Sequence, residues 1–267
     1  MTHLLHTIAL HEYMTAALLL LAHLVRPFKL GPPLARLFAG SGALLHGVAL
    51  GTLLWAQGGE PVGLAQACSA VSLALVAISL FVELWYRQPV LGAFLLPLGT
   101  AVLVPAQMGD SGVLVPSLKG PILPLHVTVA LLALAAVAAA AGVALVYLLM
   151  ERQVKLKHFG ILFSRLPPLQ VLDELNRRLV VWGFVAISLT VISGAFFVRG
   201  TGPGLSWSAK EVATLAAWVM FGALLLARLL AGWRGRRVAL LTVAGFGVLL
   251  ISFFSAFDPV TRAAGVQ

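Results

Sequence analysis

The residues of this chain that could bind a metal ion or a metal cofactor are mainly its seven histidines. A neutral imidazole is a common ligand of transition metals and of haem iron. The chain has one cysteine, Cys68, and no CxxCH motif, so it forms no internal disulfide and carries no covalently attached c-type haem. It also lacks the clustered HxH, HxxxH and CxxC motifs of zinc and copper sites. The histidines therefore permit a non-covalent, b-type haem without demanding one.

His46 lies near the middle of an apolar segment, residues 34–56, that we expect to be helical. Its neighbours on the helix surface are Gly42, Ala43 and Ala49, which leave almost no side-chain volume around the imidazole. Such a surface could make room for a flat macrocycle. It could equally mark close packing of two helices, with His46 hydrogen-bonded to a carbonyl or a hydroxyl. The residues alone leave both interpretations open.

His126 opens a second helix with small neighbours, expected over residues 121–149. From the rise of an α-helix, His126 lies roughly 8 Å and His46 about 15 Å from the outer ends of their helices. Both imidazoles would then lie in the outer half of a membrane, where they could ligate one iron between them. His11 is a further candidate for a ligand of the iron. The face below His126 continues through small and apolar residues: Ala130, Ala133, Val137, Ala140 and Ala144.

A turn-rich segment before the seventh apolar run, residues 199–211, reads RGTGPGLSWSAKE. Its aromatic side chain is Trp207. A tryptophan at this position is usually an anchor at the membrane interface. The alternative is a flat aromatic lid over a planar ligand.

The elements that must position these residues are transmembrane helices. Hydrophobic residues make up 60% of the chain and charged residues 10%, and the mean hydropathy is +1.01. A water-soluble enzyme is excluded, because a soluble domain carries about 25% charged residues. Since a spanning helix needs about 20 apolar residues, we predict a single transmembrane domain over residues 1–267. Its eight helices are expected at roughly 8–26, 34–56, 63–86, 89–108, 121–149, 179–198, 209–231 and 237–257.

One connection is longer and charged, residues 151–178. After Pro167 and Pro168, leucines and valines recur at helical spacing, which predicts a short cytoplasmic amphipathic helix on the membrane surface. The predicted fold class is therefore an all-α, polytopic integral membrane protein with eight transmembrane helices and one such surface helix.

The positions of the basic residues predict the orientation, because cytoplasmic loops are enriched in Lys and Arg. With both termini on the outer side, four of the 18 basic residues face outward, namely Lys119, Arg199, Lys210 and Arg262. The others face inward: Arg26, Lys29, Arg36, Arg87, Arg152, Lys155, Lys157, Arg165, Arg177, Arg178, Arg228, Arg234, Arg236 and Arg237. The net charge of +9 is thus explained by membrane topology, with attraction to anionic membrane lipid as an addition. Binding of nucleic acid is not needed to explain it.

Charged residues deep in a membrane would indicate a proton-coupled transporter or pump. The candidates Glu12, Glu83 and Arg228 all lie near helix ends, where Arg228 can extend to the surface. The sequence therefore ranks a transporter below the other functional classes.

The order of several motifs resembles the cytochrome c assembly family of the CcsA/CcmC type, and especially its HemX-like branch. The resemblance covers most of residues 80–255. It is carried by LPLHV at 123–127, LLMERQVKLKHF at 148–159, LPPLQVLDELNRRLVVWGF at 166–184, the loop ending in Trp207, Lys210 and Glu211, then Trp218, and GWRGRR at 232–237.

This resemblance implies a bacterial inner-membrane or thylakoid protein that handles haem. By the family pattern, His126 matches the first outer histidine, and Trp207 matches the end of a tryptophan-rich outer loop. His46 would be a membrane histidine. The chain departs from the pattern where Ser208 and Ala209 stand before the Lys-Glu pair in place of the usual aspartate, and where residues 257–267 lack a second outer histidine.

We therefore expect a haem-binding membrane protein of c-type cytochrome biogenesis, which handles or delivers haem at the outer face of the bacterial inner membrane. The expected ligands of the haem iron are His126 and His46, and the expected partners are another membrane protein of cytochrome c maturation and apocytochrome c. No catalytic acid, base or nucleophile is visible, so the chain would be at most part of a haem ligase system. The alternative is a non-catalytic regulator of haem biosynthesis of the HemX-like kind, or a structural subunit of a membrane complex. In the HemX-like branch, the regulation is associated with the level of glutamyl-tRNA reductase.

Overall fold

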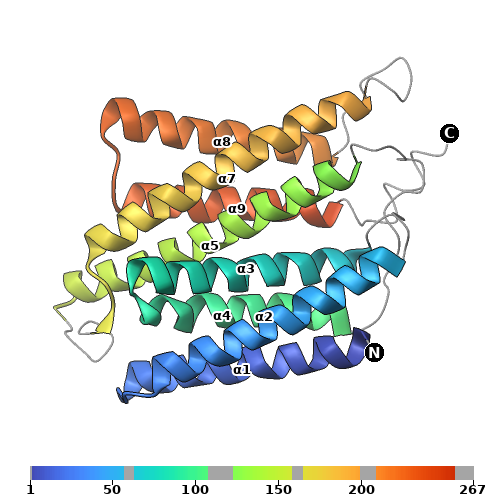
Figure 1. Cartoon of the computed structure of the whole chain (residues 1–267). Helices are drawn as coiled ribbons and strands as arrows, with labels where there is room; N and C mark the ends of the chain where they lie inside the picture. The colour runs from blue at the N-terminus through green and yellow to red at the C-terminus, as the bar shows by residue number, and fades with distance from the viewer. Residues whose placement is uncertain (1, 57–62, 108–122, 158–164, 199–208, 256–267) are drawn as a thin grey trace.

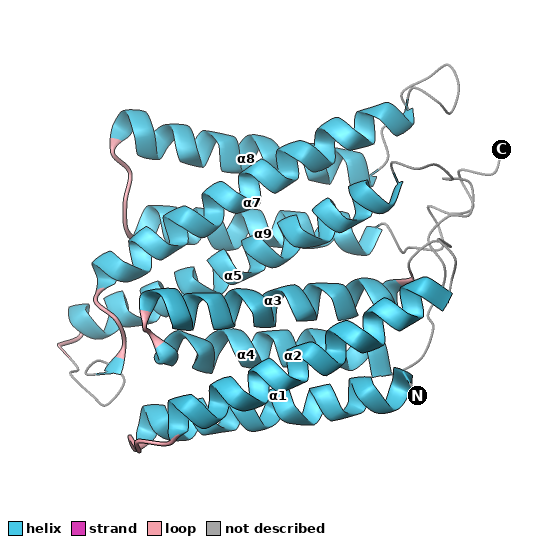
Figure 2. Cartoon of the chain, in the orientation of Figure 1, coloured by secondary structure: helices cyan, strands magenta, loops and turns pink. Residues whose placement is uncertain are grey.

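The computed structural model describes residues 2–56, 63–107, 123–157, 165–198 and 209–255. Eight of its helices are long and apolar enough to cross a membrane, which confirms the all-α fold with eight membrane helices in the predicted fold class. Helices and their connecting loops make up the described residues (Figure 2). The elements are α1 (Thr2–Val25), α2 (Gly31–Ala56), α3 (Leu64–Tyr86), α4 (Pro89–Leu103) with a 3-10 turn η1 (Val104–Gln107), α5 (Leu123–Lys155), α7 (Leu169–Val198), α8 (Ala209–Ala231) and α9 (Arg236–Ser255).

The helices run side by side and alternate in direction, so the bundle has two ends (Figure 1). One end carries the turns α1–α2, α3–α4 and α8–α9 together with the end of α5 and the start of α7; we call it the basic end, after the arginines in these turns. The other carries the first turns of α1, α3, α5 and α8 and the last turns of α2, α7 and α9. We call it the histidine end, because His6 and His126 lie there in the first turns of α1 and α5.

Helix α5 is the centre of the larger part of the bundle, where it packs on α3, α7 and α9. Its alanine run from Ala133 to Ala144 is almost wholly buried, so this stretch is a close-packing surface. A methyl group on Gly183 of α7 would lie 2.7 Å from a methyl carbon of Val137, so the glycine is needed for this close approach. Where lipid offers no hydrophobic drive, such small residues let dispersion contacts hold helices together.

A second core joins α1, α2 and α4, with Tyr13, Ala16 and Leu20 of α1 at its centre. Helix α3 lies between the two parts and packs on both α4 and α5. At the basic end, Arg87 adopts a left-handed backbone conformation that ends α3, and Pro89 opens α4, where its missing N–H costs nothing.

Two boundaries differ from those expected from the sequence. Helix α1 begins at Thr2 instead of near residue 8, so His6 belongs to a membrane helix and not to an outer tail. The stretch 169–178 is not a separate surface helix, because it forms the first turns of the continuous helix α7. The helix begins directly after Pro168, whose carbonyl accepts from the backbone N–H groups of Val171 and Leu172.

The amphipathic spacing in these first turns of α7 was nevertheless informative, because Leu172, Leu175 and Leu179 are buried on one face. One polar residue between them, Asn176, also has a partner inside the bundle. Asn176 donates to the carbonyl of Ala140 in α5 at 3.0 Å. Because these residues pack against α5, the stretch predicted as a surface helix is the start of a membrane helix.

Candidate functional site

A buried polar network joins the first three helices near the histidine end. Tyr13 Oη of α1 lies 3.1 Å from His46 Nδ1 of α2, and His46 Nε2 lies 2.7 Å from Ser69 Oγ of α3. The same Ser69 hydroxyl lies 3.2 Å from His6 Nε2 of α1. The rings of His6 and His46 meet edge to face, with centroids 5.2 Å apart.

The network accounts for both ring nitrogens of His46. An imidazole carries one N–H donor and one acceptor when neutral, while a hydroxyl can donate one bond and accept others. Tyr13 can therefore donate to His46, His46 to Ser69, and Ser69 to His6, or every bond can run in the opposite direction. Because His46 is completely buried, these bonds satisfy polar groups that would otherwise be costly in an apolar surrounding.

The small residues beside His46 serve the packing of α1 on α2. A methyl group on Gly42 would lie 2.9 Å from Tyr13 Cε1 and 3.1 Å from the Glu12 side chain, so this surface is occupied by α1. Ala39 and Ala49 on the same helix are buried as well. Of the two interpretations left open by the sequence, close packing with hydroxyl partners describes His46 in this structure.

His126 has a different environment, at the contact of α5 with α7. Its Nδ1 lies 2.8 Å from Ser193 Oγ, and a methyl group on Gly194 would lie 3.3 Å from His126 Cε1. The pair Ser193–Gly194 thus seats and orients the ring. A histidine that ligates a metal commonly holds its second ring nitrogen on an oxygen in this way.

The other candidates from the sequence are placed as follows. His11 is exposed on α1, and its Nδ1 lies 2.7 Å from the Thr7 carbonyl of the same helix. Trp207 and most of its loop, residues 199–208, lie outside the described residues. Lys210 and Glu211 begin α8, where the Lys210 carbonyl accepts a hydrogen bond from Ser252 of α9.

The structure brings His46 together with His6, and it places His126 in a separate polar contact. His46 lies among α1, α2 and α3, whereas His126 contacts α7. In the described part of the chain, no three His, Cys, Asp or Glu side chains form a group that could hold a metal ion. Haem iron needs no such group, because one or two axial side chains hold it.

Two buried amides at the histidine end have polar atoms without a hydrogen-bond partner among the described residues. These atoms are Oε1 of Gln66, in the first turn of α3, and Nε2 of Gln107, at the end of η1. The other amide atom of Gln107 accepts from Thr7 of α1 at 3.1 Å. Buried polar atoms without partners are uncommon, and they indicate places where a water or a ligand group can bind.

Sequence reasoning missed three members of the network, namely His6, Tyr13 and Ser69. The spacing of seven residues between His6 and Tyr13 is a usable signal, since it places both on one face of a helix. The contact with Ser69 could not be inferred, because hydrophobic periodicity does not say which helices are neighbours.

Comparisons with known proteins show which family the chain is similar to. Residues 34–257 match the family model described as "Cytochrome C assembly protein". The chain is 28% identical to "Cytochrome c biogenesis protein CcsA" of Synechococcus sp. (strain JA-3-3Ab), with 79% of each chain covered. It is also 28% identical to the protein of that name from Synechococcus sp. (strain CC9902), with 83% of each covered. The corresponding protein of Thermosynechococcus vestitus is 27% identical, with 74% of this chain and 76% of that protein covered.

Proposed function

The chain belongs to the cytochrome c assembly protein family, and from this premise we propose that it binds b-type haem without a covalent bond and presents it for c-type cytochrome biogenesis. The relatives that cover most of the chain are named as cytochrome c biogenesis proteins, which supports this class of function. The proposed place is the outer face of a bacterial inner membrane, with both termini outside.

The observation that carries the proposal is the oriented ring of His126. Ligation through Nε2 would leave the contact between Nδ1 and Ser193 in place, so this contact can orient the ring toward an iron. Gly194 keeps the α7 side of the ring free of a side chain, so the ring packs directly on that helix. His126 therefore fits the role of one axial ligand.

His46 is the proposed second axial ligand, and its surroundings set a condition on that role. Either ring nitrogen would have to exchange a hydrogen bond, with Ser69 or with Tyr13, for a bond to iron. Such an exchange also requires α1 to move from the surface beside Gly42. Paired ligation further requires α2 and α5 to approach each other, because His46 lies among α1, α2 and α3 whereas His126 contacts α7. The exposed His11, or a ligand from a partner protein, is the substitute if His46 keeps its present bonds.

The remaining residues supply binding and shielding. Gln66 and Gln107 offer buried amide atoms that can bond the polar edge of a cofactor or ordered water. Trp207 is the proposed aromatic lid. When bound, haem supplies the vinyl groups to which thiols of apocytochrome c are joined, while this chain binds and orients the macrocycle. A second membrane protein of cytochrome c maturation is the expected partner.

The experiment that tests the proposal is an absorption spectrum of the purified protein. We expect a Soret band and the sharp reduced bands of low-spin haem. Trp207→Ala should lower the haem content per protein while the protein still inserts in the membrane, and Trp207→Phe should retain it as the matched control. A colourless protein that takes up no added haemin would overturn haem binding and favour the HemX-like regulator or the structural subunit.

A further inference from the structure

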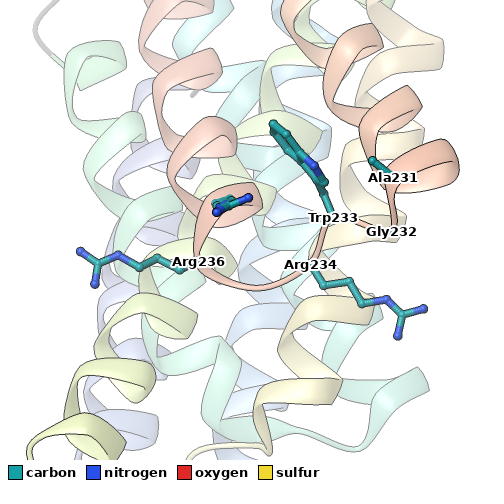
Figure 3. Close-up of a pocket in the computed structure, with 6 residues that line it drawn as sticks. Ala231, Gly232, Trp233, Arg234 and Arg236 are labelled. Carbon is teal, nitrogen blue, oxygen red and sulfur yellow. The ribbon is translucent and has the colours of Figure 1, made fainter.

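The turn between α8 and α9 forms a pocket at the basic end (Figure 3). Its volume is about 460 Å³, and it is lined by Ala231, Gly232, Trp233, Arg234, Arg236 and Arg237. In Figure 3 the guanidinium groups of Arg234 and Arg236 extend in different directions from the turn. The pocket therefore offers donors along an open rim.

The backbone of this turn is fixed by several specific contacts. Gly232 and Gly235 have φ angles of 65° and 74°, in the left-handed region that favours glycine. The backbone N–H of Trp233 donates to the Ala227 carbonyl at 3.2 Å, which satisfies a carbonyl at the end of α8. The N–H of Gly235 donates to the Asp173 carboxylate of α7 at 3.3 Å. The rim is thus presented by an ordered turn.

The four carboxylates at the basic end are all paired with other basic residues. Glu83 contacts Arg36 at 3.0 Å, and Asp173 contacts Arg228. The other two contacts join Glu151 with Lys155 and Glu174 with Arg177 and Arg178.

The pocket arginines therefore keep an uncompensated positive charge. Within the described ranges, no ion pair involves Arg234, Arg236 or Arg237, and all three side chains are exposed. The fixed turn gathers these three charges within four residues of the chain. The carboxylate that contacts this turn, Asp173 at the Gly235 N–H, pairs with Arg228 and forms no ion pair with the three pocket arginines.

An exposed apolar surface lies directly beside these charges. Leu229 and Leu230, in the last turn of α8, are each 80% exposed, and Leu226 one turn earlier is 56% exposed. On a membrane helix such side chains face lipid tails. The chain thus changes from a lipid-facing apolar surface to a cationic rim within a single turn.

We propose that this pocket binds the headgroup of an anionic phospholipid. Arginine binds phosphate through two parallel N–H bonds, and basic residues at a membrane surface attract anionic headgroups. The exposed leucines distinguish a lipid from a free phosphate ion, because only a lipid has acyl chains to lie along them. The site lies at the opposite end of the bundle from His6 and His126 and does not depend on haem binding.

The proposal is tested by native mass spectrometry of the purified protein in detergent with added dioleoyl phosphatidylglycerol. The test variant is Arg234→Gln/Arg236→Gln/Arg237→Gln. From the attraction of single basic residues to anionic lipid, the loss of three should weaken phosphatidylglycerol binding on the order of a hundredfold. The corresponding triple lysine variant keeps the charge but loses the planar fork, so it should show a smaller loss.

The matched control removes three other exposed basic residues from turns at the same end: Arg26→Gln, Lys29→Gln and Arg87→Gln. It should bind phosphatidylglycerol as the unchanged protein does, and dioleoyl phosphatidylcholine should bind weakly to all variants. Equal loss in the test and control variants would overturn the proposal, since it would reflect net charge alone. Displacement of the lipid by millimolar inorganic phosphate would also overturn it, in favour of a free-anion site.

Discussion

At the scale of single residues, His46 and His126 differ in what ligation of a metal would cost. His126 is oriented by Ser193 and can keep that contact when its other nitrogen is used. His46 would have to give up a hydrogen bond inside a buried network. Because a buried polar group left without a partner is costly, the two histidines should respond differently to substitution.

Paired ligation predicts that His126→Ala and His46→Ala each convert low-spin haem into a five-coordinate, high-spin form with weaker binding. Removal of both histidines should abolish specific binding. The measurement is the spin state from absorption and electron paramagnetic resonance spectra of the separate variants. His11→Ala is the control and should leave the spectrum unchanged.

A different result would assign His46 to packing alone. In that case His46→Ala keeps the low-spin spectrum and lowers stability by about 1–2 kcal/mol through lost hydrogen bonds. Low-spin spectra in both single variants would contradict paired ligation and direct attention to His11 or to a ligand from a partner.

Residue types alone predicted that His46 and His126 lie among small neighbours, but not what fills the space. Gly42 is compatible with a cofactor or with the ring of Tyr13, and the choice depends on which helix lies opposite. The partners of His46 are 33 and 23 residues away in the chain. Long-range contacts of this kind are set by tertiary packing, which a local pattern does not encode.

At the scale of helices, a single carboxylate at the basic end joins three elements. Asp173 of α7 pairs with Arg228 of α8 and accepts from the backbone of Gly235 in the α8–α9 turn. The Arg228 side chain is only 7% exposed, so it does not extend to the surface as the sequence allowed. Its charge is balanced inside the bundle.

Asp173→Ala should therefore lower the free energy of unfolding by about 3 kcal/mol, because it leaves a buried guanidinium without its partner. Thermal unfolding of the purified protein in detergent measures this effect. Glu174→Gln is the matched control, since Glu174 is more exposed and surface pairs contribute about 0–1 kcal/mol. Equal destabilisation by the two variants would contradict the importance of burial at Asp173.

Helix number was predictable because the thickness of a membrane sets the length of an apolar run. The helix boundaries were less predictable. The polar stretch 173–178 precedes the long apolar run of α7, yet it is helical because Asp173 and Asn176 find partners on α8, α9 and α5. Interhelical bonds thus extended a membrane helix beyond the boundary expected from hydropathy.

At the scale of the whole molecule, the even number of spans places the first turn of α1 and the last turn of α9 at the same end (Figure 1). The arginine-rich turns lie at the other end. By the enrichment of basic residues in cytoplasmic loops, the basic end should face the cytoplasm.

Cysteine labelling checks this orientation in intact cells. In a Cys68→Ser background, His3→Cys at the histidine end should react with a membrane-impermeant maleimide, and Lys157→Cys at the basic end should react only after the cells are opened. Both positions are exposed, so the difference reports the side of the membrane. Reaction of the Lys157 position from outside would reverse the proposed topology.

The residues around His46 lie partly inside and partly outside the region that the family model matches. The region shared with the family begins at residue 34, so it includes His46 and Ser69 but not the helix that carries His6 and Tyr13. The polar network thus depends on a contact between the leading helix and two helices of the matched region. A substitution confined to the leading helix therefore changes the chemistry around His46 without any change in the matched region.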